Sequence, residues 1–269
     1  MTEQEYRSHP AVSRSELFKI LDSPEKFKYF KENPEEPTPA LKFGQLFHKL
    51  LLQPESFADE FAVAVECNRR TKSGQALWEK FSEESAGKTI ITADEFALAV
   101  EMCTALKNNA WVSKMLKGEK EKEFFWTDEM TGEECKCRTD LLFEVLMDGE
   151  PVLLVIDFKT AAEADTESFI CAAINNGYDF QAAMYTEGVR ANTHKKVLFV
   201  FVVIEKKPPY AINVLQADTL LLRRGGDLFR EAIGIYHDCK KTGNWYGYLG
   251  KFNQINNLSL PAWLAKEYE

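Results

Sequence analysis

The stretch CKCRTDLLFEVLMDGEPVLLVIDFK, residues 135–159, decides the fold that this chain is expected to adopt. Two apolar runs flank Asp148-Gly149, and Asp-Gly favours the two-residue type I′ turn of a β-hairpin. Residues paired across that turn have numbers that sum to 297. Residues 152–156 form an unbroken apolar run, which is typical of a strand buried on both faces. The hairpin is therefore expected to lie inside a sheet.

The predicted register brings charged residues together at the end of the hairpin. Asp140 lies opposite Asp157 and Arg138 lies opposite Lys159, so each pair shares one face of the sheet. Two adjacent carboxylates repel each other unless a positive group lies between them, and a divalent cation with oxygen ligands meets that need. The alternative is a structural ion pair, because acidic-x-Lys occurs four times in the chain. The position of residues 157–159 at the end of a buried strand favours the metal site, since charges are costly to bury there.

The rest of the chain predicts an α/β fold, with a mixed sheet flanked by helices and a helical N-terminal part. Helices are expected at residues 13–21, 41–52, around 78, 92–116, 166–189 and 218–241. Strands are expected at residues 123–128, 135–146, 151–160, 196–205 and 210–216. We expect one domain over 1–269, in three parts: mostly helical 1–115, the sheet and its helix over 116–216, and a C-terminal helix with an aromatic tail over 217–269.

Composition limits the classes of function. The 33 Lys and Arg against 42 Asp and Glu give a net charge of −9, so a protein that coats DNA with positive charge is excluded. A nucleic-acid substrate would need a local cationic groove. The chain has no apolar run of the ~18 to 20 residues needed to span a bilayer. The N-terminal residues show no secretory signal, and the six cysteines form no disulfide framework, so we expect a cytoplasmic protein.

The order of the polar motifs resembles a known family. In chain order the motifs are GxxxH at residues 44–48, a strand glutamate at Glu123, Asp140, DxK at 157–159, and QxxxY at 181–185. Together they resemble the RecB-like branch of the PD-(D/E)XK nucleases. The segments SRSELFKILDSPEKFKYF, FGQLFHKLLLQPESF, RRTKSG, EFFWTDEMTGEECKCRTDLL, VIDFKTAAEADTESF and YDFQAAMY narrow the resemblance to the RecE-type exonucleases, from about residue 13 to 263. Thr139 replaces the proline of the family name.

The resemblance implies a role for each residue of the predicted metal site. His48, Asp140 and Asp157 would hold Mg²⁺ or Mn²⁺, and the metal would bind the scissile phosphate and lower the pKa of an attacking water. Lys159 would orient or deprotonate that water and offset negative charge in the transition state. Without the GxxxH motif, a lone histidine on an apolar helix is more often a core residue; the motif favours the ligand.

Three further residues are candidates for supporting catalysis. A loop at residues 129–132 would pair Glu123 with Arg138, so Glu123 either contacts metal or water, or forms a salt bridge to Arg138. Gln181 and Tyr185 lie on one helical face because they are four residues apart. They would position the DNA strand or brace Lys159, and ordinary packing is the alternative.

Basic residues that follow the same resemblance are candidates for contacts with DNA phosphates. Arg70 and Lys72 lie in RRTKSG, and Arg138 lies on the predicted site face. A solvated surface is the more common meaning of such clusters. Cys135-x-Cys137 does not indicate zinc, because no second Cys or His pair has matching spacing.

The predicted function is a Mg²⁺-dependent double-stranded DNA exonuclease. The resemblance implies 5′ to 3′ degradation that leaves 3′ single-stranded tails for recombination, a ring-shaped homotetramer that threads DNA ends, and a RecT-like annealing protein as partner. The alternatives are a RecB-like nuclease of other polarity or with endonuclease action, and a non-catalytic DNA-binding scaffold that retains the fold.

Overall fold

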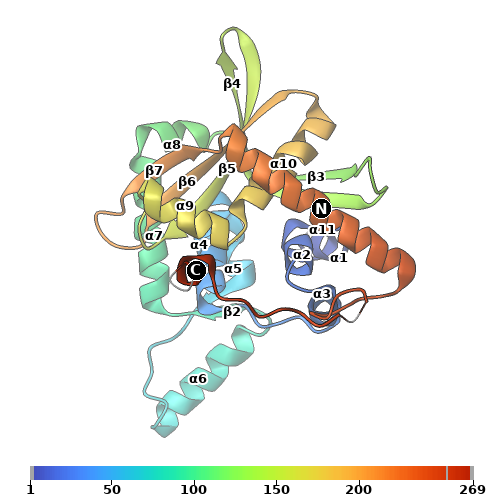
Figure 1. Cartoon of the computed structure of the whole chain (residues 1–269). Helices are drawn as coiled ribbons and strands as arrows, with labels where there is room; N and C mark the ends of the chain where they lie inside the picture. The colour runs from blue at the N-terminus through green and yellow to red at the C-terminus, as the bar shows by residue number, and fades with distance from the viewer. Residues whose placement is uncertain (1–2, 253, 267–269) are drawn as a thin grey trace.

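The hairpin of residues 135–159 lies at the centre of a five-stranded mixed sheet in the computed structural model, which describes residues 3–252 and 254–266 (Figure 1). The strands lie in the order β3 (Glu119–Thr127), β4 (Glu134–Met147), β5 (Glu150–Ala161), β6 (Lys196–Glu205) and β7 (Ile212–Gln216). The β5–β6 pair is parallel and the other pairs are antiparallel. The predicted α/β fold with a mixed sheet is confirmed.

The hairpin turn has the predicted conformation and register. Asp148 and Gly149 both have positive φ values, 54° and 82°, as a type I′ turn requires. The β4–β5 ladder then runs from Met147 and Glu150 to Leu141 and Ile156. Every one of these pairs sums to 297, so the register is confirmed as far as Leu141 and Ile156.

Past this point β4 no longer pairs with β5, and its first residues pair with the N-terminal segment. Val12 N–H donates to the Glu134 carbonyl at 2.8 Å, and Lys136 N–H donates to the Val12 carbonyl at 2.9 Å. The N-terminal segment thus pairs with the first residues of β4, while β5 continues along β6. We call the place where the β4–β5 ladder ends, at Asp140 and Asp157, the strand fork.

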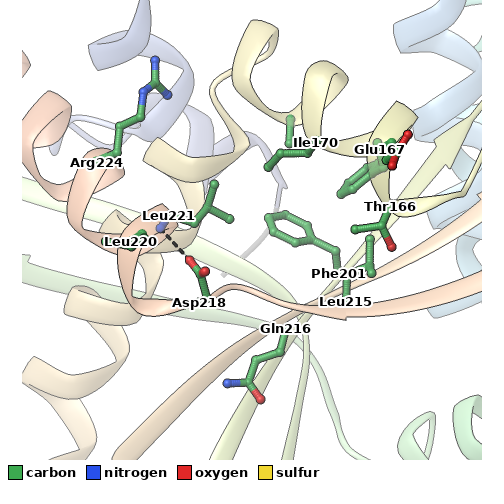
Figure 2. Close-up of a pocket in the computed structure, with 12 residues that line it drawn as sticks. Thr166, Glu167, Ile170, Phe201, Leu215, Gln216, Asp218, Leu220, Leu221 and Arg224 are labelled. Atoms are coloured by element: carbon green, nitrogen blue, oxygen red, sulfur yellow. Dashed lines mark hydrogen bonds between the residues drawn. The ribbon is translucent and has the colours of Figure 1, made fainter.

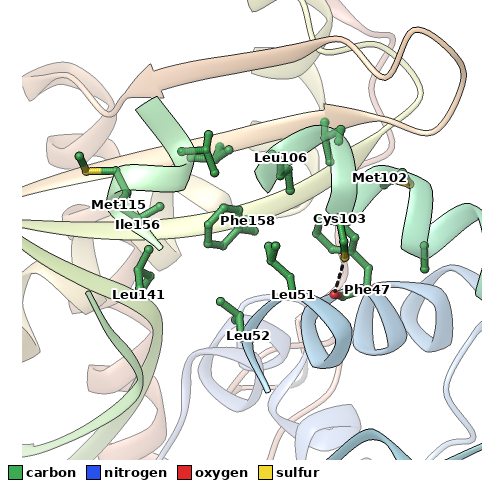
Figure 3. Close-up of a cluster of buried hydrophobic side chains, with 14 of the residues drawn as sticks. Phe47, Leu51, Leu52, Met102, Cys103, Leu106, Met115, Leu141, Ile156 and Phe158 are labelled. Carbon is green, nitrogen blue, oxygen red and sulfur yellow. Dashed lines mark hydrogen bonds between the residues drawn. The ribbon is translucent and has the colours of Figure 1, made fainter. Parts of the chain in front are cut away.

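One face of the sheet is covered by α4 (Pro39–Leu52), α7 (Ala93–Asn108) and α8 (Ala110–Met115). Figure 3 shows Phe47 and Leu51 of α4 packed near Leu141 and Phe158 of the sheet. Both α4 side chains are almost completely buried, and burying each contributes about 1.5 to 3 kcal/mol. This packing fixes α4, and with it His48, against the end of the hairpin.

The other face is covered by α9 (Thr166–Asn175) and α10 (Tyr178–Thr193). The single helix predicted over 166–189 is divided, because Gly177 adopts a left-handed φ of 63°. A third layer, formed by α11 (Thr219–Thr242), α2 (Arg14–Ile20) and α3 (Pro24–Glu32), packs outside α10. A capping box begins α2, with Ser13 N–H donating to Glu16 Oε2 at 2.8 Å.

The remaining elements lie at the periphery. They are α1 (Glu3–Ser8), η1 (Pro54–Ser56), α5 (Phe57–Glu60), β1 (Phe61–Val63), α6 (Lys72–Glu84), β2 (Thr89–Ile91) and α12 (Ala262–Ala265). Strands β1 and β2 form a separate parallel pair, and α6 projects from the body in Figure 1. The helix expected over 92–116 is two helices, because Asn109 leaves helical geometry and caps the second. Within the described residues, no helix combines the length and apolarity needed to cross a bilayer.

Candidate functional site

The strand fork brings together the residues of the predicted metal site. Asp140 Oδ2 accepts the backbone N–H of Phe158 at 2.8 Å, so a carboxylate takes the place of the next ladder bond. Asp157 is 2% exposed and Lys159 follows it on the same face of β5. Two carboxylates and one ammonium group therefore meet where β4 and β5 separate.

Lys159 is held by three side chains. Its Nζ lies 2.5 Å from Asp157 Oδ2, 3.2 Å from Gln181 Oε1 and 4.6 Å from the ring centre of Tyr178. Gln181 Nε2 also donates to Asp157 Oδ1 at 2.5 Å. The buried Gln181 therefore joins the carboxylate and the ammonium group. Bracing Lys159 is one of the roles predicted for Gln181, beside positioning the DNA strand, and its part in catalysis stays a prediction.

His48 reaches the fork from α4. Its Nε2 lies 2.8 Å from the Phe158 carbonyl oxygen and its Nδ1 lies 3.5 Å from Asp140 Oδ1. A carbonyl oxygen can only accept a hydrogen bond, so Nε2 carries a proton. In the neutral ring, the Nδ1 lone pair then faces a carboxylate oxygen. Such a contact is favourable only with a proton or a cation between the two atoms.

The electrostatics of the fork disfavour negative charge on Asp140. Burial raises the pKa of Asp140; His48 opposes this shift and the nearby Asp157 adds to it. Lys159 and the Phe158 N–H lower that pKa in part. Additional positive charge at the fork would therefore favour the ionised form of Asp140.

The donor set fits a hard divalent cation by its chemistry. Asp140, Asp157 and His48 offer carboxylate oxygens and an imidazole nitrogen, and the buried Asp157 Oδ2 meets Lys159 without a properly aligned hydrogen bond. Among the residues that the structure describes, no three His, Cys, Asp or Glu side chains form a cluster that could hold a metal ion. The fit therefore rests on the kinds of donor and on the two neighbouring carboxylates, which a cation would stabilise.

Glu123 lies one strand away from the fork. It pairs with Arg138 across the β3–β4 ladder, as the predicted loop requires. Arg138 Nε forms an ion pair with Glu121 at 2.9 Å, and the guanidinium lies 4.9 Å from the Tyr6 ring. Glu121 has a positive φ of 50° and lies between Lys120 and Lys122, where the β3–β4 ladder skips one pair. The strand register predicted for Glu123 is confirmed, and its catalytic role stays a prediction.

Tyr185 and the predicted DNA-binding residues of α6 occupy different surroundings. Tyr185 packs against Phe199, with ring centres 6.3 Å apart, and burial raises its pKa well above the ordinary value. Arg70 and Lys72 are exposed at the start of α6, which projects away from the sheet in Figure 1. The structure therefore gathers His48, Asp140, Asp157, Lys159 and Gln181, places Tyr185 beside them, and leaves Arg70 and Lys72 on a separate projection.

A comparison with protein families decides the broad assignment. Residues 13–257 match the model of a PDDEXK-like domain of unknown function, DUF3799. The chain belongs to this family. The match includes every residue of the fork, and it establishes the wider family that the motifs predicted, whereas the RecE-type assignment stays a prediction.

Solved structures support the fold of this PDDEXK-like domain. A crystal structure described as a "putative exonuclease" from Eubacterium rectale is 16% identical, with a TM-score of 0.61, and the alignment covers 99% of this chain and 97% of that one. At this identity the likeness shows the fold alone. The structure of SSO0001 is 17% identical over 72% of this chain and 86% of that one. Its TM-score of 0.31 is too low to support an inference about the fold. No curated protein matches the chain.

Sequence reasoning missed two contributors to the site of this PDDEXK-like domain. Tyr178 lies three residues before Gln181, on the same helical face, and that spacing was the available signal. The Phe158 carbonyl faces His48, which no side-chain motif could reveal because a backbone atom provides the contact.

One cavity lies away from the fork. It measures about 510 Å³ and lies between α9, the end of β7 and the start of α11 (Figure 2). Phe169, Ile170 and Leu221 line it, and Asp218 at its edge caps α11 by accepting the Leu221 N–H at 2.7 Å. Its lining is mainly apolar and contains none of the fork residues, so the cavity is not the candidate site.

Proposed function

We propose that this PDDEXK-like domain is a Mg²⁺- or Mn²⁺-dependent exonuclease that hydrolyses double-stranded DNA from its ends, 5′ to 3′. The observation that carries the proposal is the ion pair of Lys159 with the buried Asp157, next to a second carboxylate, Asp140. A structural ion pair does not require a second buried carboxylate. Metal-assisted phosphodiester hydrolysis makes use of this combination, because carboxylates hold the cation and the lysine offsets negative charge on the phosphate.

Each fork residue has a task in that reaction. Asp140, Asp157 and His48 would hold the divalent cation, which supplies Lewis-acid activation of the scissile phosphate and of water. Lys159, as an ammonium, would orient the attacking water and offset negative charge on the phosphate. To deprotonate that water it would first have to lose its own proton. Gln181 keeps the Lys159 ammonium within reach of the attacking water, and the ring of Tyr178 packs against the same ammonium.

The other predicted residues act around this centre. Glu123 would hold water or metal from β3, and Tyr185 would support the wall behind Gln181. Arg138, Arg70 and Lys72 would contact phosphates along the duplex. Local positive charge in an acidic chain is consistent with a DNA groove, because clefts focus the local field. A ring-shaped tetramer and a RecT-like annealing partner belong to the same proposal and rest on the resemblance alone.

The experiment uses purified protein with end-labelled duplexes. We expect linear blunt DNA to be degraded with Mg²⁺ and preserved with EDTA, and covalently closed circles to be spared. Labels at the 5′ or the 3′ ends then report polarity from the order in which short products appear. Efficient cutting of closed circles would instead show the endonuclease alternative, and absence of metal-dependent nucleotide release would favour the non-catalytic scaffold.

A further inference from the structure

Arg14 on α2 connects the N-terminal segment to the turn between α9 and α10. Its Nη2 donates to the carbonyl oxygen of Asn176 and, at 2.8 Å, to that of Gly177. These carbonyls lie more than 160 residues further along the chain. No side-chain motif marks this contact, because both acceptors are backbone atoms.

The Gly177 carbonyl is shared between Arg14 and the first turn of α10. It also accepts the backbone N–H of Gln181 at 3.1 Å. The Gln181 side chain in turn contacts Asp157 and Lys159, and Tyr178 at the start of the same turn lies under Lys159. A single carbonyl therefore separates the Arg14 guanidinium from the residue that braces the candidate catalytic lysine.

The turn packs closely against α2 at Gly177. Phe18, four residues after Arg14 on α2, presents its ring to Gly177, and a Cβ added at Gly177 would lie only 2.3 Å from Phe18 Cε2. The Arg14 guanidinium carbon lies 5.0 Å from the centre of the same ring. Interiors packed this closely transmit small displacements, so the position of α2 determines that of the turn.

The side chain of Arg14 is partly buried. Burial lowers the pKa of its guanidinium, and the charges of Tyr185 and Asp157 act in the opposite direction. Its Nε is buried without a hydrogen-bond partner. Burying a cation is costly, and the two carbonyl bonds offset that cost only while the turn stays in place.

We propose that Arg14 is a positioning residue: by holding the α9–α10 turn it sets Gln181 and Tyr178 against Lys159. This inference rests on the proposed nuclease function, in which Lys159 acts on the attacking water. It makes the N-terminal segment, which also pairs with the start of β4 at Val12, an integral part of the catalytic centre.

The test compares Arg14→Gln and Arg14→Lys with a matched control, Arg190→Gln. Arg190 also donates from its guanidinium to a backbone carbonyl, that of Val197 at 3.3 Å, and it belongs to the last turn of α10. With linear duplex and saturating Mg²⁺, Arg14→Gln should lower kcat about 10- to 100-fold with KM nearly unchanged, as a small misplacement of a catalytic group does. Arg14→Lys should recover part of the loss, and Arg190→Gln should keep wild-type kcat.

A double-mutant cycle isolates the route of the effect. Because Arg14 acts through Gln181 as well as Tyr178, Arg14→Gln should cost clearly less activity in a Gln181→Ala background than in the wild type. An equal loss of kcat in both backgrounds would overturn the proposal. A rise in KM with unchanged kcat would also overturn it, since that result marks a residue that binds DNA directly.

Hydrogen exchange supplies a readout that does not depend on nuclease activity. Amides of residues 176–183 should exchange faster in Arg14→Gln than in wild type or Arg190→Gln, because the Gly177 carbonyl loses a partner. Unchanged exchange would refute the hold on the turn even if the nuclease assay succeeds. Faster exchange in a protein without any nuclease activity would instead place the failure in the proposed function.

Discussion

Asp140 Oδ2 accepts the Phe158 N–H at 2.8 Å, so a carboxylate closes the β4–β5 ladder at the point where the backbone pairing ends. The same carboxylate lies near the buried Asp157, whose charge adds to the rise that burial causes in the pKa of Asp140. Without metal, the two charges are expected to oppose folding.

Asp140→Asn should therefore leave the metal-free protein at an equal or higher melting temperature than wild type. The amide removes the charge and retains an oxygen that can accept the Phe158 N–H. Added Mg²⁺ should raise the melting temperature of the wild type, because a ligand of the folded state stabilises it, and should change that of the mutant little. Nuclease activity should be almost lost. A mutant that is less stable without metal yet keeps its Mg²⁺ response would show that the carboxylates do not share a site.

Lys159→Ala should lower kcat by roughly 10²- to 10³-fold, the loss typical of removing one group that stabilises charge in a transition state. DNA binding should change little. In the metal-free protein, the mutation also leaves the buried Asp157 with Gln181 alone, so the melting temperature should fall and Mg²⁺ should recover much of it. Lys196→Ala, at the exposed start of β6, is the control for general loss of a lysine. Wild-type turnover in Lys159→Ala would remove this residue from the mechanism.

The hairpin could be predicted from sequence because its signals are local. Asp148-Gly149 specifies the turn, the turn specifies the register, and the register brings Asp140 near Asp157. The register could not predict that the β4–β5 pairing ends at Leu141 and Ile156. The start of β4 pairs with Val12 of the N-terminal segment and not with β5. That pairing depends on a segment more than 120 residues away.

Contacts made by backbone atoms account for most of what the sequence did not reveal at the site. The QxxxY motif made Gln181 a candidate for bracing Lys159 or positioning DNA. The Phe158 carbonyl next to His48 and the Gly177 carbonyl held by Arg14 carry no residue-type signal. The division of the 166–189 helix has a different origin, because Gly177 adopts a left-handed φ of 63°, a conformation that glycine favours at helix ends.

Arg70 and Lys72 provide a test of the DNA path. If both contact phosphates, the double variant Arg70→Gln/Lys72→Gln should bind duplex more weakly regardless of sequence, and the slope of log K against log salt should decrease by about 0.9 per lost contact. Lys80→Gln is the control, because Lys80 lies on the same projecting helix and pairs with Glu84. Fluorescence anisotropy over a salt series measures the slope. An unchanged slope would assign the pair to a solvated surface.

Asp128 predicts how stability depends on acid. The carboxylate is buried at the β3–β4 turn, where Oδ2 accepts the Thr131 N–H at 2.9 Å and the Thr131 hydroxyl at 2.7 Å, and Oδ1 contacts Arg230 of α11. Burial raises the pKa of Asp128, but the Thr131 hydrogen bonds and the Arg230 charge outweigh it, and the pKa lies below its ordinary value. An acid with a lowered folded-state pKa contributes stability above its unfolded-state pKa and loses that contribution as the pH falls through its folded-state pKa.

Asp128→Asn should therefore destabilise the protein by about 1.5 to 3 kcal/mol at neutral pH, the usual contribution of hydrogen bonds to a charged group. The difference from wild type should be constant from neutral pH down to about pH 4, the ordinary carboxyl pKa, and should shrink below it. Urea unfolding at a series of pH values measures both effects, with the exposed Asp227→Asn as the control on α11. A difference that stays constant into strong acid would show that Asp128 contributes through packing, and its charge would have no part in holding the β3–β4 turn to α11.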